Sequence, residues 1–175
     1  MLKETFSKIY DNHINEIYRF VYLRTNQREV AEDLASEIFF KFWQHNKNKK
    51  DEYIKSPRAF LYKIARNMLI DFYRKSNQEK RSLSLESFDD SFALPKELVD
   101  DGFAQTVELE EKQEKIQKAL SKINPLYSDI IIWYYIEGLN SKEIAQIIQK
   151  TEGNVRVLIH RALESLKKEI GEEVN

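Results

Sequence analysis

The stretch NSKEIAQIIQKTEGNVRVLIHRALESLKK, residues 140–168, decides the fold, because two amphipathic helical patterns follow one another there almost without a break. The first pattern places Ile144, Ala145 and Ile148 on one side of a helix. The second begins after Thr151, a residue type that caps helix N-termini, and its apolar residues recur at helical spacing. These residues are Val155, Leu158, Ile159, Ala162 and Leu166. Two short amphipathic helices joined by such a tight turn are typical of a helix-turn-helix.

The outer face of the second helix follows from the rotation of about 100° per residue in an α-helix. With Val155 pointing inward, the outward residues are Gly153, Arg156, Val157, His160, Arg161, Glu164 and Lys168. Such a face suits the major groove of DNA, where Arg156 and Arg161 would bond guanine edges or phosphates. His160 would donate a hydrogen bond or stack, and Val157 would touch a thymine methyl group. The alternative is an ordinary solvated face, since tight helix pairs also occur in plain helical domains.

The composition is that of a globular protein, with 42% hydrophobic and 33% charged residues among 175. This length is sufficient for one ordinary domain or two small ones. The absence of cysteine excludes disulfides and thiolate metal sites and fits a reducing compartment. The N-terminal residues have no apolar signal-peptide core, and the longest apolar run, residues 130–136, is far shorter than a membrane span. The cytoplasm is therefore the expected location.

The net charge of −1 conceals two blocks of opposite sign. Residues 41–81 carry twelve basic and four acidic side chains, a charge of +8, whereas residues 82–110 carry one basic and eight acidic side chains, a charge of −7. A basic block followed by an acidic block indicates two modules and a linker. Since strand alternation is absent, we expect an all-α protein. Its two small helical domains, residues 1–81 and 107–175, would be joined by an acidic flexible linker, residues 82–106, and the second would contain the helix-turn-helix.

Two helices are expected at the start of the first domain, over residues 6–23 and 28–44, because apolar residues recur there every three or four positions. The first stripe consists of Phe6, Tyr10, Ile14, Ile17 and Val21, and the second of Val30, Leu34, Ile38 and Phe42. Off the second stripe lie Asp33, Ser36, Glu37 and Lys41. Phe39 and Phe42 are expected in the core, whereas for Phe40 and Trp43 both a core position and a partner surface remain open.

A third helix is expected from Pro57 to about residue 75, since serine at the N-cap followed by proline is a strong helix start. Its buried stripe would consist of Leu61, Ile64, Ala65, Met68 and Phe72. An opposite, largely basic sector consists of Lys63, Arg66, Asn67 and Arg74. This sector suits a nucleic-acid backbone with some base recognition, and Tyr53, Phe60 and Tyr62 would supply stacking platforms for unpaired bases. The alternative is a solvated charged face with core aromatics.

The segment of residues 82–106 lacks a sustained helical stripe and contains proline, glycine and several serines, as linkers do. Its interleaved phenylalanines indicate that it docks on a surface rather than serving only as a tether. Beyond it, a helix is expected over residues 107–123, followed by a second over residues 126–137 that ends at Gly138. The stripe of the first of these consists of Leu109, Ile116, Leu120 and Ile123.

Taken together, these motifs resemble a bacterial sigma factor of the extracytoplasmic-function type, within the sigma-70 family. The segment DLASEIFFKFW, residues 33–43, is similar to the family's polymerase-binding segment. The segment SPRAFLYKIARNMLIDFYRK, residues 56–75, is similar to the one that opens and recognises the downstream (minus-ten) promoter element. The run from ALSKINPLYSDIII through HRALESLKK, residues 119–168, is similar to the domain that recognises the upstream (minus-thirty-five) element. The resemblance covers nearly the whole chain. The three segments follow one another in the family's order, with an acidic linker between the second and the third.

The resemblance implies three sets of contact residues. The polymerase-binding residues would be Asp33, Ser36, Glu37, Phe40 and Lys41. The DNA-binding residues would be Lys63, Arg66, Asn67 and Arg74 in the first domain, and Arg156, Val157, His160 and Arg161 in the second. Asn67 and the loop of residues 47–55 would hold an unstacked base of the melted strand. The chain departs from the family's usual residues at Gln149 and Val157, where glycine and serine are common.

The resemblance implies a protein that acts by binding: to core RNA polymerase, to promoter DNA that is duplex upstream and melted downstream, and to an anti-sigma factor. No cofactor, metal or catalytic residue is expected, since three scattered histidines and four distant glycines form no such site. No direct membrane insertion is expected either. One rival hypothesis is a stand-alone helix-turn-helix regulator that binds duplex DNA without polymerase. Another is a helical interaction module that contacts no DNA.

Overall fold

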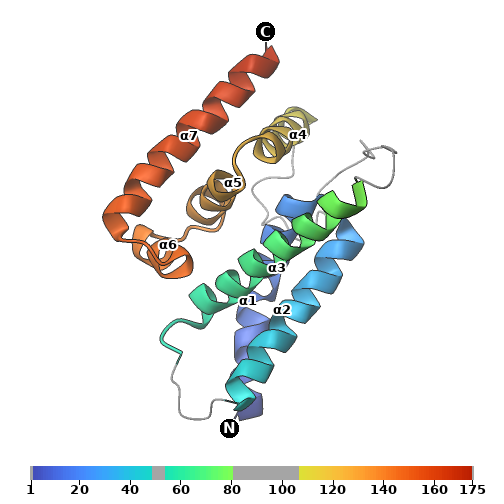
Figure 1. Ribbon diagram of the computed structural model, residues 1–175, viewed down its shortest axis with the longest axis vertical. Coiled ribbons are helices and arrows are strands. Elements are labelled where there is room, and N and C mark those ends of the chain that lie inside the picture. Colours follow the sequence, from blue (N-terminus) through green and yellow to red (C-terminus); the bar gives the residue numbers. More distant parts are fainter. Residues whose placement is uncertain (1, 49–53, 81–106, 175) are drawn as a thin grey trace. The chain divides into compact units, whose positions relative to one another are not determined.

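The chain forms two compact units, Met1–Asp90 (unit 1) and Ser91–Asn175 (unit 2), which are described separately. The computed structural model describes residues 2–48, 54–80 and 107–174. In these ranges every regular element is helical (Figure 1), so the predicted all-α fold with two helical units is confirmed. The predicted linker, residues 82–106, lies outside the described residues, as does Tyr53.

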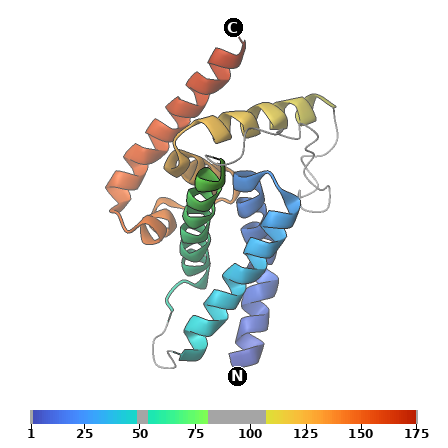
Figure 2. The ribbon, with the colours of Figure 1, turned by 45° about the vertical axis from the view of Figure 1, so that its right-hand side comes forward.

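Unit 1 contains three helices that pack pairwise around one core: α1 (Leu2–Thr25), α2 (Arg28–Asn48) and α3 (Pro57–Lys80). The two ribbon views show them side by side (Figures 1 and 2). The largest fully buried side chains of this unit are Ile17, Phe20, Ile38, Phe42, Leu61 and Tyr62. Each side chain of this size stabilises the fold by roughly 1.5–3 kcal/mol when it is removed from water. The core therefore draws on all three helices.

Burial along α1 differs from the predicted stripe, because it is concentrated in the second half of the helix. Ile17 and Val21 are fully buried as predicted, but Tyr10 is 39% exposed. The additional buried residues of the second half are Tyr18, Phe20, Tyr22 and Leu23. Tyr10 still contacts α2, with its ring 4.9 Å from that of Phe39. The second half of α1 is more deeply buried because it packs against α3 as well as α2. At the contact with α3, the ring of Phe20 lies edge-on to that of Tyr62, with 5.4 Å between the ring centres.

The buried face of α2 agrees with the predicted stripe in its second half, at Ile38 and Phe42, but is displaced by one position in its first half. Its buried residues are Ala31, Ala35, Ile38, Phe39 and Phe42. Val30 and Leu34, predicted as core, are only half-buried. In the first half of α2 small alanine side chains let a neighbouring helix approach closely, so Val30 and Leu34 lie at the edge of the interface. The core positions predicted for Phe39 and Phe42 are confirmed.

The start of α3 is as predicted: the Ser56 hydroxyl accepts a hydrogen bond from the Ala59 N–H at 3.2 Å, and Pro57 follows the cap. The stacking platforms proposed for unpaired bases are wrong at Tyr62, which is fully buried in the core. Phe60 is half-buried and packs within unit 1, with its ring 4.7 Å from that of His45. A helical wheel treats each helix alone and does not show which aromatic rings a neighbouring helix covers.

Unit 2 consists of α4 (Val107–Lys122), α5 (Pro125–Ile131), a π-helical turn η1 (Ile132–Ile136), α6 (Ser141–Ile148) and α7 (Glu152–Val174). Its fully buried side chains include Leu120, Ile130, Ile132, Trp133, Leu139 and Ile144. Helix α7 contacts α4, α5 and α6, so it forms the spine of the unit. Ile116, predicted in the α4 stripe, is 37% exposed, and the buried residues beside it are Gln117 and Ala119.

The sequence did not predict the π-helical turn at the end of α5. Helix α5 begins as expected after Asn124, whose side chain accepts a hydrogen bond from the Leu126 N–H at 2.9 Å. The backbone then widens, and the Glu137 N–H donates to the Ile132 carbonyl five residues earlier at 2.8 Å. Gly138, with φ of 70°, ends the element as predicted. A single extra residue in a helical turn leaves no distinct trace in hydrophobic periodicity.

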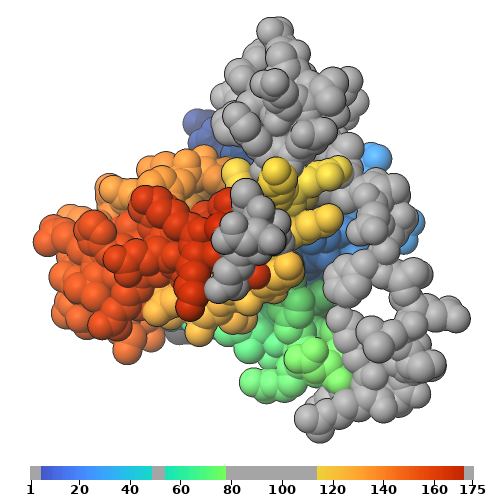
Figure 3. Space-filling model, turned by 90° about the horizontal axis from the view of Figure 1, so that it is seen from above, coloured from blue at the N-terminus to red at the C-terminus, as the bar shows by residue number. Residues whose placement is uncertain are grey.

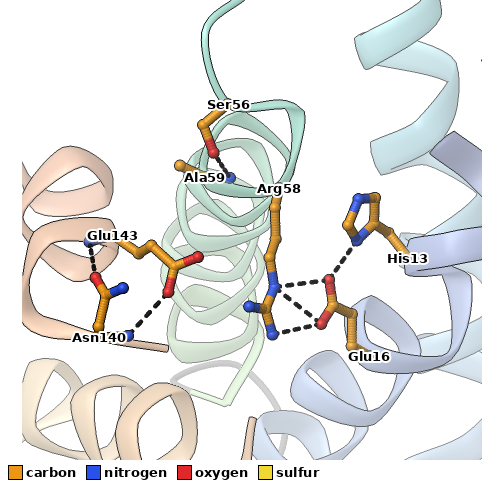
Figure 4. A network of polar contacts seen from close by, with 7 residues as sticks. All are labelled: His13, Glu16, Ser56, Arg58, Ala59, Asn140 and Glu143. Carbon is orange, nitrogen blue, oxygen red and sulfur yellow. Dashed lines mark hydrogen bonds and ion pairs between the residues drawn. The ribbon is translucent and has the colours of Figure 1, made fainter. Parts of the chain in front are cut away.

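The helix-turn-helix of α6 and α7 is fixed by a cap at the start of each helix. The Glu143 N–H donates to the Asn140 side chain at 2.9 Å, and the Asn140 N–H donates to the Glu143 carboxylate at 2.8 Å (Figure 4). The Thr151 hydroxyl accepts from the Asn154 N–H at 3.2 Å, which makes it the predicted cap of α7. In α6 the predicted stripe is wrong in one position, because Ile147 is buried and Ile148 only half-buried.

Gln149 ends α6 in a left-handed conformation, with φ of 57° and ψ of 47°. A β-carbon is strained there, whereas glycine adopts this conformation freely. We therefore expect Gln149→Gly to raise the free energy of unfolding of unit 2 by about 0.5–1 kcal/mol. Urea unfolding monitored by tryptophan fluorescence in a Trp43→Phe background measures this, since the fully buried Trp133 then reports on unit 2.

The matched control is Gln149→Ala, which removes the same polar side chain but keeps the β-carbon. We expect it to leave the free energy of unfolding unchanged or slightly lower. Equal stabilisation by both substitutions would show that the glutamine side chain, and not the backbone conformation, carries the strain.

Candidate nucleic-acid and partner interfaces

The outer face of α7 has the composition predicted from the helical wheel. All seven of its residues are exposed: Gly153, Arg156, Val157, His160, Arg161, Glu164 and Lys168. On the opposite side of α7, Val155, Ile159 and Ala162 are buried against the rest of unit 2. The space-filling view shows α7, in orange to red, along the surface of its unit (Figure 3). The geometry therefore presents two arginines, a histidine and a valine on one rigid helical surface.

Arg156, one of the charged residues of this face, is held only loosely by its neighbour. The Arg156 guanidinium lies 3.4 Å from the Glu152 carboxylate one turn earlier, and the two side chains are 67% and 47% exposed. An exposed pair of this kind stabilises a helix by about 0.3–0.5 kcal/mol. Arg156 can therefore exchange Glu152 for a phosphate or a base edge at little cost.

The basic sector predicted on α3 is only partly on the surface. Asn67 and Arg74 are exposed, whereas Lys63 and Arg66 are half-buried. The Nε atom of Arg66 is buried. Asn67 and Arg74 thus have side chains fully available to a ligand, and Lys63 and Arg66 present only part of theirs. The geometry brings these four residues onto one helix, and their role in binding DNA stays a prediction.

The residues predicted on α2 as polymerase contacts all face solvent. They are Asp33, Ser36, Glu37, Phe40 and Lys41. The Lys41 ammonium lies 3.8 Å from the Glu37 carboxylate, in an exposed pair. Phe40 is 54% exposed, and its ring stacks at 6.3 Å on that of Trp43. Because Phe40 is not part of the core, it joins two carboxylates and a lysine in one surface suited to a protein partner.

Sequence reasoning missed an ion-pair cluster that joins α1 to the start of α3. The Arg58 guanidinium donates to the Glu16 carboxylate from two nitrogens, at 2.8 Å from Nη2 and at 3.0 and 3.1 Å from Nε, while His13 Nδ1 lies 2.6 Å from the same carboxylate (Figure 4). Burial would raise the pKa of Glu16, but the hydrogen bonds and charges of His13 and Arg58 outweigh it and hold this pKa below its ordinary value of 4.5. Glu16 and Arg58 are 42 positions apart, so no local pattern could have paired them.

A second contact fixes the far part of α3 against the end of α1. The Tyr73 hydroxyl donates a hydrogen bond to the Arg24 carbonyl, and the Arg24 guanidinium lies over the Tyr73 ring, 5.5 Å from its centre. Together with the Glu16–Arg58 pair, this contact holds α3 at two points along its length. The side chains of α3 between these points, including Asn67, are therefore presented from a firmly positioned helix.

Neither a metal-binding cluster nor a helix able to cross a membrane occurs in the ranges that the structure describes. No group of three or more histidine, aspartate or glutamate side chains there could hold a metal ion. None of the helices in the same ranges is both long and apolar enough to cross a membrane. The candidate functional surfaces are thus the exposed faces of α2, α3 and α7.

Two protein families match the chain, one in each unit. Residues 9–79 match the family described as Sigma-70 region 2, and residues 113–166 match the family described as Sigma-70, region 4. The first range contains the predicted contact residues of α2 and α3, and the second contains those of α7. Together the two matches cover more than half of the chain.

Similar curated proteins include two from Bacillus subtilis. The chain is 28% identical over 167 residues to the ECF RNA polymerase sigma factor SigM, covering 93% of each protein. It is also 28% identical over 174 residues to the ECF RNA polymerase sigma factor SigW, covering 96% of this chain and 90% of that protein. Both comparisons extend over nearly the whole length of the proteins.

Two solved structures share the fold. The sigma factor RpoE of Bartonella quintana, in complex with the anti-sigma factor NepR, superposes with a TM-score of 0.71 at 19% identity, covering 96% of this chain and 98% of that one. CnrH, in complex with the cytosolic domain of CnrY, superposes with a TM-score of 0.63 at 18% identity, covering 95% of this chain and 87% of that one. At these identities the likeness concerns the fold.

Proposed function

Because this chain belongs to the extracytoplasmic-function sigma factors of the sigma-70 family, we propose that its two units divide the work of promoter recognition between them. The protein binds core RNA polymerase and directs promoter-specific initiation of transcription. The observation that carries this function is the presence of both sigma regions in one chain, in the family's order. A stand-alone regulator needs only the helix-turn-helix, so the region 2 match in unit 1 disfavours that alternative.

In this proposal unit 1, through α2, binds the polymerase. The contact residues are Asp33, Ser36, Glu37, Phe40 and Lys41, all exposed. Carboxylates at the rim would orient the complex, and the exposed ring of Phe40, backed by Trp43, would supply the apolar anchor that such interfaces need.

Helix α3 and the loop before it would hold the melted downstream element. Asn67 carries a donor and an acceptor on an exposed side chain, as recognition of an unstacked base requires. Arg74 and the exposed parts of Lys63 and Arg66 would bind phosphates. Capture of the base would offset an unstacking cost of roughly a few kcal/mol.

Unit 2 would place α7 in the major groove of the upstream element, where Arg156, Val157, His160 and Arg161 meet the base edges and the backbone. Throughout, the protein would act by binding and not by catalysis, in the cytoplasm where polymerase is found, and without a cofactor. The −7 charge of residues 82–110 suits a path through a channel built for nucleic acid. Since RpoE of Bartonella quintana forms a complex with an anti-sigma factor, we expect a protein of that class to regulate this chain too.

The test is binding to bacterial core RNA polymerase followed by transcription from a random promoter library. We expect a stable complex, and transcripts whose templates share two spaced upstream motifs. The free protein should bind duplex DNA weakly. Tight, specific duplex binding by the free protein, together with no binding to polymerase, would favour the stand-alone regulator instead.

The polymerase surface is tested by Asp33→Ala combined with Glu37→Ala. Both side chains are exposed, so we expect normal folding and at least a tenfold loss of affinity for core polymerase, about 1.4 kcal/mol. Titration of labelled protein with core enzyme measures the loss. Asp11→Ala, an exposed carboxylate on α1, serves as the control and should have no effect. Unchanged polymerase affinity in the double variant would remove the assignment of α2.

A further inference from the structure

An apolar side chain stands in the middle of the polar outer face of α7. Val157 is 48% exposed. Among the α7 side chains that the structure describes, no other large hydrophobic residue is exposed. Its neighbours on that face are Arg156, His160 and Arg161. The core residues of α7 point the other way, so Val157 lies outside the core of unit 2.

The stability of the helix gives no reason for valine at this position. Branching at Cβ makes valine a weaker helix former than alanine, lysine or arginine, and on an exposed site no packing compensates. The same branching holds the side chain in one dominant rotamer within a helix. Val157 is therefore a stiff apolar group that is already positioned before any ligand arrives.

The major groove contains one apolar group that such a side chain can contact, the 5-methyl group of thymine. At the corresponding position cytosine has only a C–H group, and the purines present the N7 acceptor, which a valine would desolvate without bonding. A valine on a groove-facing helix thus favours thymine over cytosine through the methyl contact, and disfavours the purines also through an unmade hydrogen bond.

Gly153, one turn before Val157 on the same face, provides a second observation. A β-carbon added at Gly153 would meet only the Thr151 hydroxyl, at 4.0 Å, which is ordinary van der Waals contact. Neither packing within unit 2 nor backbone conformation therefore demands glycine. A glycine that its own protein does not need is typical of a place where a ligand or another backbone approaches closely.

We propose that Val157 selects a thymine in the upstream promoter element by contact with its 5-methyl group, and that Gly153 leaves the clearance that lets the DNA approach α7. This inference rests on the proposed function, since it requires α7 to lie in the major groove. It assigns a base and a chemical group to Val157, one of the proposed contact residues of α7, and it adds a role for Gly153.

The experiment uses the reconstituted holoenzyme and a promoter selected from the random library. Each thymine of the upstream element is replaced in turn by uracil, which lacks only the 5-methyl group. At one position, or at two adjacent ones, we expect uracil to weaken promoter binding about three- to fivefold, as the loss of one buried methyl contact predicts. With Val157→Ala, binding to the thymine and uracil promoters should become equal.

Two further variants make the test specific. At the sensitive position, 5-methylcytosine should bind more tightly than cytosine with the wild-type protein and equally with Val157→Ala. Gly153→Ala should fold normally and lose promoter affinity about tenfold or more, while its affinity for core polymerase is unchanged. Because Val157 and Gly153 are exposed, neither substitution removes a core contact.

The outcomes separate this inference from the function on which it rests. If binding depends on the upstream element but every uracil promoter equals its thymine parent, the proposed role of Val157 is wrong and the sigma function stands. The same conclusion follows if Val157→Ala still discriminates thymine from uracil. If transcription does not depend on an upstream element at all, both the placement of α7 and this inference fall together.

Discussion

Reversing the two arginine charges on the outer face of α7, by Arg156→Glu with Arg161→Glu, should weaken binding of the holoenzyme to its promoter by a factor of about 100 or more. A single arginine contact to a base edge contributes about 1–3 kcal/mol, and the introduced carboxylates also repel phosphates. Promoter binding measured over a range of salt concentrations should show a slope reduced by about 2. Binding to core polymerase should not change.

The matched control is Lys115→Glu with Lys118→Glu, two exposed lysines on α4. It changes the net charge of unit 2 by the same amount but leaves the face of α7 intact. We expect less than a fivefold effect on promoter binding. An equal loss in both double variants would mean that the overall charge of the unit, and not the arginines of α7, governs binding.

Removing the guanidinium of Arg58 should have the largest effect on stability. In Arg58→Met, the Glu16 carboxylate, only 13% exposed, loses the guanidinium whose Nε and Nη2 both donate to it. We expect unit 1 to lose about 2 kcal/mol, which corresponds to a fall in melting temperature of roughly 10 °C. Thermal unfolding monitored by circular dichroism at pH 7 measures the change. The control is Arg28→Met, whose ion pair with Glu32 is exposed and should contribute less than about 0.5 kcal/mol.

The pH dependence of this difference follows from the lowered pKa of Glu16. A carboxyl group whose pKa is lower in the folded state stabilises the fold fully above its unfolded pKa, near 4.5. The stabilisation is lost as the pH falls through the lower, folded value. The stability of Arg58→Met should therefore converge on that of the wild type below pH 4.5. A difference that is as large at pH 3 as at pH 7 would mean that Arg58 acts through packing alone.

Features that depend on a few neighbouring residues could be predicted from the sequence. Ser56 and Thr151 act as helix caps because capping requires only a side-chain oxygen and a backbone N–H three residues away. The outer face of α7 was predicted correctly for the same reason: its residues are fixed by the rotation of one helix, once Val155 is known to point inward. The proposed roles of these residues came from family resemblance and not from periodicity.

Features that depend on a second helix could not be predicted. Tyr62 is buried because Phe20 lies against it, and Arg58 is held by a carboxylate on another helix. The first half of the buried face of α2 consists of alanines, which a pattern of large apolar residues does not include. In each case the deciding partner lies far away in the sequence, so the helices could be placed along the chain but not against one another.

The capped turn between α6 and α7 has a consequence for how DNA is bound. Backbone hydrogen bonds within the protein close this turn on both sides: the Lys150 N–H donates to the Ala145 carbonyl at 3.2 Å, and the Val155 N–H to the Thr151 carbonyl at 3.1 Å. The element that enters the groove is thus complete before it meets DNA, and association orders little backbone. Mutations that lower the stability of unit 2 elsewhere should reduce the amount of active protein, while each folded molecule keeps its promoter affinity and its promoter preference.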